Sequence, residues 1–384
     1  MRTVRLGDVC AITAHQVDPR DPAFSGLPLI NGENIVSGRC RLSFARTAAD
    51  EGVISPKYIF RPRDVLYSKL RPYLRKAVVA ETPGLCSADM YPLTVDPTQL
   101  DPHWLCWQLV SDGFTGYANR ASARARMPKL NREQLLAYEF KLPALEVQRL
   151  VAQALASSVG AAAIAAEAAR SRIRNATLLR ATVVRELVPL PPGGDWPWVP
   201  LSDAAEFLDH LREPVNETER RARLSRSTGP RYPYFGANGQ AGWIDAYRFD
   251  EDLVLLAEDG GAFGSDERSI AYRVSGPCWV NNHAHVLRAL PGVDIDYLGY
   301  ALAVRPDVGA LITGSTRGKL NRVIAASIPV SLPPIAEQRR IAAELRERLA
   351  TIDQMTGAID TQLEAIEALP AALLRRAFEE IEAA

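Results

Sequence analysis

The sequence predicts an α+β protein built from two mixed α/β domains in tandem, each followed by a long helix, with the two helices packed as an antiparallel coiled coil. Three observations lead to this prediction. The chain repeats itself, each repeat opens with short apolar runs separated by turn residues, and each repeat closes with a long stretch of helical apolar spacing. A chain of 384 residues with 47% hydrophobic content is long enough to bury a core in two or three domains.

The repeat rests on three short sequence anchors that occur twice. They are KLNR at Lys129 and Lys319, LP at Leu142 and Leu332, and QR at Gln148 and Gln338. In each pair the second copy follows the first by 190 residues. Weaker matches keep nearly the same offset, such as VRLGDVCAI at Val4 with VPLSDAAEF at Val199. The duplication predicts that both halves of the chain share one fold.

The two mixed domains are expected at residues 1–143 and 191–333. The first contains the apolar runs PLINGENIV, DVLYSKL, KAVVA and MYPLTV, and the second contains YPYFG, GWIDAYRF, DLVLLA, SIAYRV and HAHVLRAL. Gly, Pro and Asp separate these runs, which is typical of strands and turns. ANGQAGWI is expected to form a hairpin, and EDGGAFGSDE a loop whose glycines allow a positive φ.

The long helices are expected at residues 144–190 and 334–384, each starting near a proline. The first is rich in alanine, which favours helix and lets a partner approach closely. The second has a predicted coiled-coil seam of Ile341, Leu345, Leu349, Ile352, Met355, Ile359, Leu363, Ile366 and Leu369. Pro370 is expected to kink or interrupt this helix. The stretch PLPPGGDWPW has the composition of a linker between the two repeats.

Composition limits the class of protein. The net charge is zero, but residues 1–143 hold 19 Lys and Arg against 14 Asp and Glu, whereas residues 191–333 hold 14 against 18. Arginine supplies 39 of the 45 cations, which suits bidentate contacts to guanine or phosphate, although genomic base composition explains the bias equally well. The five cysteines show no CxxC spacing. No signal peptide or long uncharged apolar run is present, so a cytoplasmic protein without a membrane partner is expected.

A search for catalytic motifs predicts no catalytic residue and no metal site. The segment TGSTRGK resembles a phosphate-binding loop, but it is one residue short and Leu320 replaces the hydroxyl residue. His283, His285 and Cys278 do not make a four-ligand zinc set. Asp64 with Lys69 is a poor imitation of a nuclease core. Two alternatives remain open, a cryptic DNA-modifying enzyme and a stand-alone DNA-binding protein.

Several segments resemble the specificity subunits of type I restriction-modification systems. The clearest is SLPPIAEQRRIAAELRERLATIDQMTGAIDTQLEAIEALPAALLRRAFEE, which resembles the closing conserved region of that family. KLNREQLLAYEFKLPALEVQRLVAQALA resembles its central conserved region in a more diverged form. INGENIVSG, DVLYSKLRPYLRKAVV and YFGANGQAGWIDAYRFDEDLVLLAEDGGAFG look like the body of its recognition domains.

The resemblance implies a non-catalytic subunit with two target recognition domains. Each would read one half of a bipartite site on double-stranded DNA, and the helices would act as spacers. The expected partners are two methyltransferase subunits and two restriction-translocase subunits. No cofactor is expected in this chain, because S-adenosylmethionine, ATP and magnesium would belong to the partners. A helix of roughly 35 to 40 residues spans about 50 to 60 Å, more than one turn of DNA.

DNA contacts are expected from polar residues in loops between strands. In the first domain they are Ser68, Lys69, Arg71, Arg75, Lys76, Arg124, Arg126 and Lys129. In the second they are Asn238, Gln240, Asn281, Asn282, Ser315, Thr316, Arg317 and Lys319. A solvated strand-and-turn face explains the basic segment YSKLRPYLRK equally well, and the repeated Asn131 and Asn321 are expected to be helix caps or turns.

The helices are expected to mediate assembly with the partner subunits. The residues predicted for this interface are Ile341, Leu345, Leu349, Ile352, Ile359 and Leu363. On this basis, replacing Leu345 and Leu349 by Asp should abolish methyltransferase recruitment or solubility. Replacing Lys69 and Arg71 by Ala should weaken DNA binding and leave assembly intact.

Overall fold

A computed structural model describes residues 1–13, 15–122, 127–312 and 318–383. The predicted contact residues Arg124, Arg126, Ser315, Thr316 and Arg317 lie outside these ranges. The chain forms two compact units. Unit 1 contains Met1–Ala168 with Gln362–Ala384, and unit 2 contains Ala169–Thr361. Each unit therefore combines a mixed domain with one end of each long helix. The boundaries between the units fall inside the two helices, after Ala168 and after Thr361.

Unit 1 contains two main sheets. The first has the order β10-β9-β12-β2, with strands Ala77–Val79, Val65–Ser68, Met90–Val95 and Cys10–Ile12. The second has the order β3-β8-β11-β4-β7, with strands Gln16–Val17, Lys57–Phe60, Gly84–Cys86, Pro28–Ile30 and Arg46–Thr47. Short pairs are formed by β1 (Arg2–Arg5) with β13 (Glu139–Leu142) and by β5 (Ile35–Val36) with β6 (Arg41–Leu42).

Unit 2 is arranged in the same way. One sheet has the order β15-β22-β19-β20, with strands Ala205–Phe207, Ala284–Ala289, Leu253–Ala257 and Ala271–Val274. The other has the order β17-β16-β21-β18, with strands Gly239–Ile244, Tyr232–Gly236, Pro277–Val280 and Phe249–Asp250. A short pair joins β14 (Trp198–Pro200) to β23 (Pro329–Ser331).

The two units share their topology, which confirms the repeat in three dimensions. The order β2-β12-β9-β10 in unit 1 corresponds to β15-β22-β19-β20 in unit 2. Both units contain one parallel pair in the second sheet, β4 with β11 and β16 with β21. In both, the first strand of the unit pairs with the strand just before the long helix. The predicted hairpin is present as β16 and β17.

The short helices repeat as well, and side-chain caps explain where they begin. The helices α2 (Pro102–Val110) and α7 (Ile295–Ala303) are capped by Asp101 and Asp294. Asn131 caps α4 (Arg132–Leu136) and Asn321 caps α8 (Arg322–Ala326), so the cap prediction for the KLNR repeat is confirmed. The remaining short helices are α1 (Leu6–Val9), α3 (Asp112–Ser122) and α6 (Glu217–Arg226).

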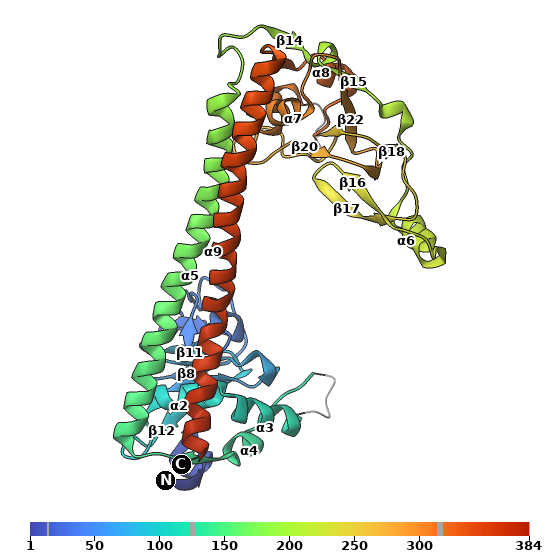
Figure 1. The fold of residues 1–384 in the computed structure, drawn as a ribbon. Coiled ribbons are helices and arrows are strands. Elements are labelled where there is room, and N and C mark those ends of the chain that lie inside the picture. Colours follow the sequence, from blue (N-terminus) through green and yellow to red (C-terminus); the bar gives the residue numbers. More distant parts are fainter. Residues whose placement is uncertain (14, 123–126, 313–317, 384) are drawn as a thin grey trace. The chain divides into compact units, whose positions relative to one another are not determined.

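The long helices are α5 (Leu145–Leu187) and α9 (Ile335–Ala383), and they lie side by side and antiparallel in each unit (Figure 1). In unit 1 the start of α5 shares a core with the end of α9, through Leu155 and Phe378 among others. In unit 2 the end of α5 shares a core with the start of α9, through Val184 and Leu345. The helix α9 continues through Pro370 without interruption.

The predicted seam of α9 is wrong at two positions, Met355 and Leu369, whose exposed fractions are 59% and 45%. An α-helix has 3.6 residues per turn, so a stripe with a repeat of 3.5 residues drifts around the helix. The inward positions are instead taken by the half-buried Thr356 and the buried Pro370. By length and composition alone, α5 is long and apolar enough to span a membrane. A single helix that meets these two criteria is weak evidence of a membrane span.

Candidate DNA interface

The predicted basic segment of unit 1 lies in the loop that follows β9. Ser68 ends the strand and is buried, and its backbone N–H donates to the carbonyl of Lys76 at 2.9 Å. The loop continues through Lys69 and a 3-10 turn, Pro72–Leu74 (η2), to Arg75. It therefore starts and ends next to the same edge of the sheet, which holds its cationic residues in one place.

Lys69 is buried, unlike the other cations of this loop, Arg71, Arg75 and Lys76. Its exposed fraction is 8%, its Nζ donates to the carbonyl of Ala88, and it lies 5.0 Å from the ring centroid of Tyr91. Burial lowers the pKa of its ammonium group, and nearby Lys129 lowers it further. A long contact of 3.8 Å joins Lys69 to the carboxylate of Asp89. These contacts give Lys69 a structural role in supporting the loop.

Arg71 and Arg75 lie on either side of η2, and both have a left-handed backbone, with φ of 49° and 48°. This conformation is uncommon for residues other than glycine and costs about 1 kcal/mol or more each, so surrounding contacts must hold it. Arg75 pairs with Asp112 at 2.6 Å, and Lys76 donates to the carbonyl of Gly32 at 2.6 Å. The side chain of Arg71 is exposed. Of Arg71, Arg75 and Lys76, Arg71 is therefore the one that is exposed.

The structure brings Lys129 to the same loop, although it is distant in sequence. An isolated β-bridge pairs Lys129 with Leu70, and the N–H of Leu130 donates to the carbonyl of Lys69 at 3.0 Å. The ammonium of Lys129 is about half exposed and lies 3.7 Å from Asp89. The two cationic segments predicted for the first domain thus meet at one edge of unit 1.

Unit 2 repeats this geometry with a carboxylate in place of the lysine. The N–H of Leu320 donates to the carbonyl of Glu258 at 2.7 Å, and an isolated bridge pairs Lys319 with Asp259. Glu258 thus occupies the position that Lys69 has in unit 1, and the ammonium of Lys319 lies 3.1 Å from its carboxylate. The two units therefore share a scaffold but present different charges at it.

The amide residues predicted for unit 2 lie near this loop, in the turn between β16 and β17, at the start of β17 and just before β22. Asn238 is exposed in the turn between β16 and β17, and its amide donates to the carbonyl of Gly260 at 3.0 Å. Gln240 is also exposed, and its amide donates to Gly242. Asn281 and Asn282 precede β22 and line a cavity of about 490 Å³. The side-chain oxygen of Asn281 accepts a hydrogen bond from the backbone N–H of His283. The amide nitrogen of Asn281 takes no part in that bond.

Beneath this turn lies a buried cluster of charges formed by Asp209, Arg212, Glu258 and His285. Arg212 donates to Glu258 at 2.8 Å, and the two ring nitrogens of His285 lie 2.7 Å from Asp209 and 2.8 Å from the carbonyl of Leu320. Burial raises the pKa of Asp209, but the hydrogen bonds and charge of its partners lower it by more. Asp209, Glu258 and His285 offer two carboxylates and one imidazole, which are groups that can bind a metal. Their bonding atoms are already engaged by Arg212 and by one another, which makes the cluster an ion-pair network.

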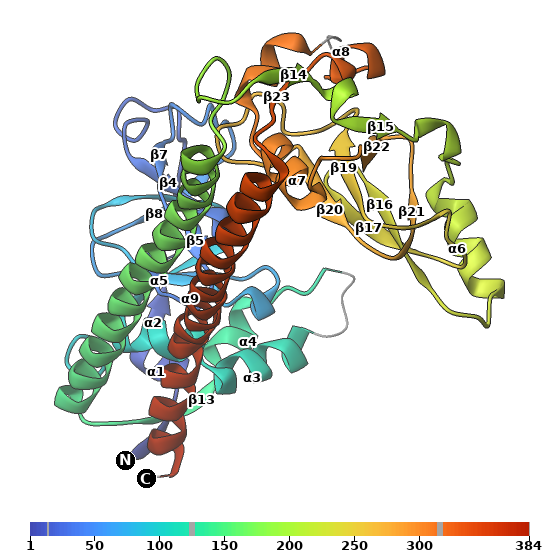
Figure 2. The same cartoon turned by 45° about the horizontal axis from the view of Figure 1, so that its top comes forward.

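An arginine-rich helix in unit 2 escaped the sequence prediction. The segment ETERRARLSR forms α6, none of whose residues is buried, and it packs beside β17 (Figure 2). Arg220 of this helix lines the same cavity as Asn281 and Asn282. The signal was available, since residues 217–231 contain five arginines in a domain that is acidic overall.

The predicted interface residues of α9 lie partly in the interior. Ile341, Leu345, Leu349 and Ile352 are buried in the core of unit 2, and Ile359 and Leu363 are half-buried. Other apolar residues of the long helices are exposed. They are Val147, Leu150, Ile164, Leu178, Leu179, Met355 and Leu369.

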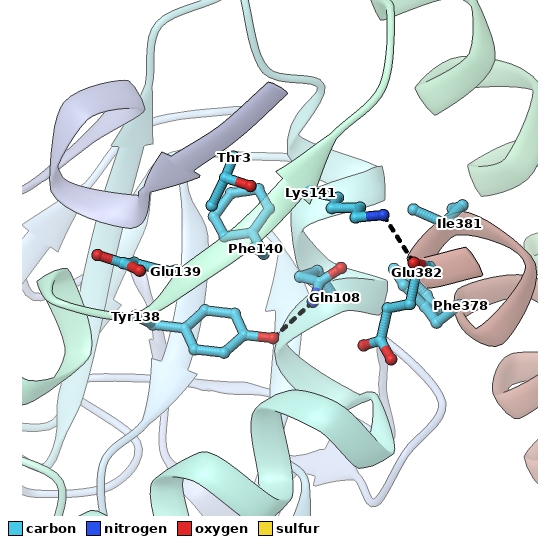
Figure 3. Close-up of a pocket in the computed structure, with 9 residues that line it drawn as sticks. All are labelled: Thr3, Gln108, Tyr138, Glu139, Phe140, Lys141, Phe378, Ile381 and Glu382. Atoms are coloured by element: carbon cyan, nitrogen blue, oxygen red, sulfur yellow. Dashed lines mark hydrogen bonds between the residues drawn. The ribbon is translucent and has the colours of Figure 1, made fainter. Parts of the chain in front are cut away.

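A smaller cavity of about 250 Å³ lies in unit 1 beside the end of α9 (Figure 3). Gln108 donates to the hydroxyl of Tyr138 at 2.8 Å, and Lys141 donates to the carbonyl of Glu382 at 2.8 Å. Burial raises the pKa of Tyr138 to about 12, so it stays a neutral phenol. The bond from Lys141 fastens the last turn of α9 to the domain, which gives this cavity a structural role.

Residues 214–365 match the family model described as the type I restriction modification DNA specificity domain. The chain contains a type I specificity domain. The matched range covers most of unit 2 and the first part of α9, including α6, the amide turn, and Glu258 and His285 of the charge cluster. The resemblance to type I specificity subunits is thereby confirmed.

Two curated relatives are named as specificity subunits of type I restriction enzymes. The specificity subunit of the type I restriction enzyme EcoDI from Escherichia coli is 35% identical over 127 residues, which is 32% of this chain and 28% of that protein. The putative type I specificity subunit S.HindORF215P from Haemophilus influenzae is 30% identical over 149 residues, which is 39% of this chain and 36% of that protein. The matches thus span about a third of each relative.

Two solved structures share the fold of the whole chain. One comes from work on complex assembly and conformational transition of the type I R-M system, with a TM-score of 0.78 and 20% identity over 98% of this chain and 97% of that chain. The other is the HsdS subunit from Thermoanaerobacter tengcongensis, with a TM-score of 0.61 and 20% identity over 98% and 96%. The likeness confirms the predicted fold class, two mixed domains each followed by a long helix.

Proposed function

We propose that this chain is the DNA-specificity subunit of a type I restriction-modification complex and that it catalyses no reaction itself. In this proposal each unit reads one half of a bipartite target on double-stranded DNA, and α5 with α9 act as the spacer. The observation that carries the proposal is the repeated loop geometry, Lys69 with Leu130 in unit 1 and Glu258 with Leu320 in unit 2. One scaffold with different polar groups suits two readers of different sequences.

The partners in this proposal are two methyltransferase subunits and, through them, two restriction-translocase subunits. S-adenosylmethionine, ATP and magnesium would be bound by those partners, in the cytoplasm. The support from this chain is the set of exposed apolar residues on the long helices, such as Leu150 and Ile164 with exposed fractions of 67% and 75%. Large apolar side chains left exposed on a helix are candidates for contact with another protein.

The experiment that tests this function is co-expression of the chain with the methyltransferase subunit of its own system, followed by mapping of N6-methyladenine in the host DNA. We expect a bipartite motif, two short tracts separated by unread bases, that disappears when the chain is omitted. Methylation that does not depend on the chain would contradict the proposal. A single continuous motif would contradict the assignment of one half-site to each unit.

A further inference from the structure

The helix α6 is an unusual element of unit 2 because it contributes nothing to a hydrophobic core. None of its residues is buried, and a helix that is polar on all sides gains little from packing. Two arginines fasten it instead. Arg223 pairs with Asp245 at 2.8 Å and stacks on Trp279, and Arg220 donates to the carbonyl of Trp243 at 3.2 Å.

The other arginines of this segment face the solvent. Arg221 has a side chain that is 76% exposed, and it pairs with Glu217, one turn earlier on the same helix. Arg226 bonds through Nε to the carbonyl of Ala222, and Arg231, which follows the helix, is exposed. An exposed pair of this kind stabilises a helix very little, so the arginines are not explained by folding.

The charge of the rest of unit 2 makes this position informative. Residues 191–333 have more acidic than basic residues, whereas residues 217–231 contain five arginines and two glutamates. An acidic surface repels DNA, so a domain of this composition needs a local group of cations to hold phosphates. The segment from Glu217 to Arg231 is such a group.

The cavity of about 490 Å³ lies between this helix and the turn before β22. Asn216 and Arg220 line it from the side of α6, and Asn281, Asn282 and His283 line it from the turn. Amide side chains can form two hydrogen bonds with adenine, at N6 and N7. A polar cleft beside a helix that binds phosphates is therefore suited to the major-groove edge of a base.

We propose that α6 and Arg231 hold the DNA backbone at the half-site of unit 2, and that the cleft beside them receives a base edge read by Asn282. This inference rests on the proposed function, and it names the surface that unit 2 uses. Arg221, Arg226 and Arg231 supply phosphate contacts, which set position, and Asn282 supplies sequence discrimination.

The test uses the full chain in complex with its methyltransferase and compares two kinds of variant. In the first, Arg221, Arg226 and Arg231 are changed together to Gln. We expect at least a tenfold fall in affinity for target DNA near 150 mM salt, with the same methylated motif and a salt dependence shallower by roughly 0.9 for each phosphate that is no longer neutralised. Changing the same residues to Lys should restore most of the affinity. In the second, Asn282→Ala should keep the salt dependence and relax one base position in one half-site.

Two controls make the outcome decisive. Thr218→Ala changes α6 without removing charge, and Arg20→Gln removes an exposed, acid-paired arginine of unit 1 whose side chain is 66% exposed. The single variant Arg221→Gln is the matched comparison for Arg20→Gln. The inference fails if the triple arginine variant binds like Thr218→Ala, or if Arg20→Gln weakens binding as much as Arg221→Gln. Failure of the proposed function would appear separately, as a wild-type complex that methylates no bipartite motif. In that case the salt dependence of non-specific DNA binding, compared between the wild type and the arginine variant, would still test the role of α6.

Discussion

The side-chain oxygen of Gln148 accepts a hydrogen bond from the backbone N–H of Asp101 at 2.9 Å, although 47 residues separate them. The amide nitrogen of Gln148 donates to the carbonyls of Gln99 and Pro143. Gln338 makes the same three kinds of contact in unit 2, including one to the N–H of Asp294 at 2.8 Å. Each glutamine thus locks the first turn of a long helix to the mixed domain, which explains why QR recurs in the repeat.

Replacing Gln148 by Leu is expected to lower the thermal stability of the chain. The change leaves three backbone groups without this partner, two of them buried and one partly buried, at about 1 to 3 kcal/mol for each buried unsatisfied group. A destabilisation of this size corresponds to a fall in Tm of several degrees for a domain of this length. Calorimetry should show the fall, and Gln338→Leu should match it in unit 2. The exposed Gln153→Leu is the control, and an equal effect from it would refute the lock.

Two leucines of the long helices are expected to behave differently when changed to Asp. Leu345 is fully buried in unit 2, so Leu345→Asp buries a charge without a partner and should cost at least about 3 kcal/mol of stability. Leu150 is 67% exposed, so Leu150→Asp should leave the chain folded and abolish co-purification with the methyltransferase. Size-exclusion chromatography with circular dichroism distinguishes the two. Normal assembly of a folded Leu150→Asp chain would argue against the exposed apolar face as the interface.

The cations at the loop of unit 1 are expected to separate into a structural residue and binding residues. Lys69→Met removes the donor to Ala88 and should lower Tm by a few degrees. Changing Arg71 and Lys129 together to Gln should leave Tm unchanged and weaken DNA binding by the complex about tenfold, with a shallower salt dependence. Thermal denaturation and binding measured over a salt series test this. An equal fall in Tm for both variants would contradict the separation.

Acid is expected to destabilise unit 2 through Asp209. The pKa of this carboxyl in the folded chain lies below its ordinary value, because the hydrogen bonds and charge of His285 and its neighbours outweigh burial. Its stabilising effect is therefore complete above about pH 4, and it disappears as the pH falls below that value through the folded pKa. Urea unfolding at pH 6, 4 and 3 should show a smaller acid effect for Asp209→Asn than for the wild type. If Asp209→Asn and the wild type lost stability equally as the pH falls, Asp209 would be excluded as the cause of the acid effect.

Much of the architecture was predictable because it follows from local patterns. The strands, the hairpin at β16 and β17, the caps Asn131 and Asn321 and the two long helices all depend on residues close together in sequence. Turn chemistry, capping and helical periodicity act over a few residues, so they can be read without knowing the fold. The meeting of the Lys69 loop with the Lys129 segment was not predictable in this way.

The sequence by itself determined that two similar units exist, that each combines strands with a long helix, and which polar segments are candidates for DNA. Only the tertiary structure decided that Lys69 is buried while Arg71 is exposed, that Glu258 takes the place of Lys69 in unit 2, and that Leu345 is interior. It also placed α6 beside the turn of Asn281 and Asn282. The physical reason is that burial and charge pairing depend on contacts between segments far apart in the chain, which no local pattern records.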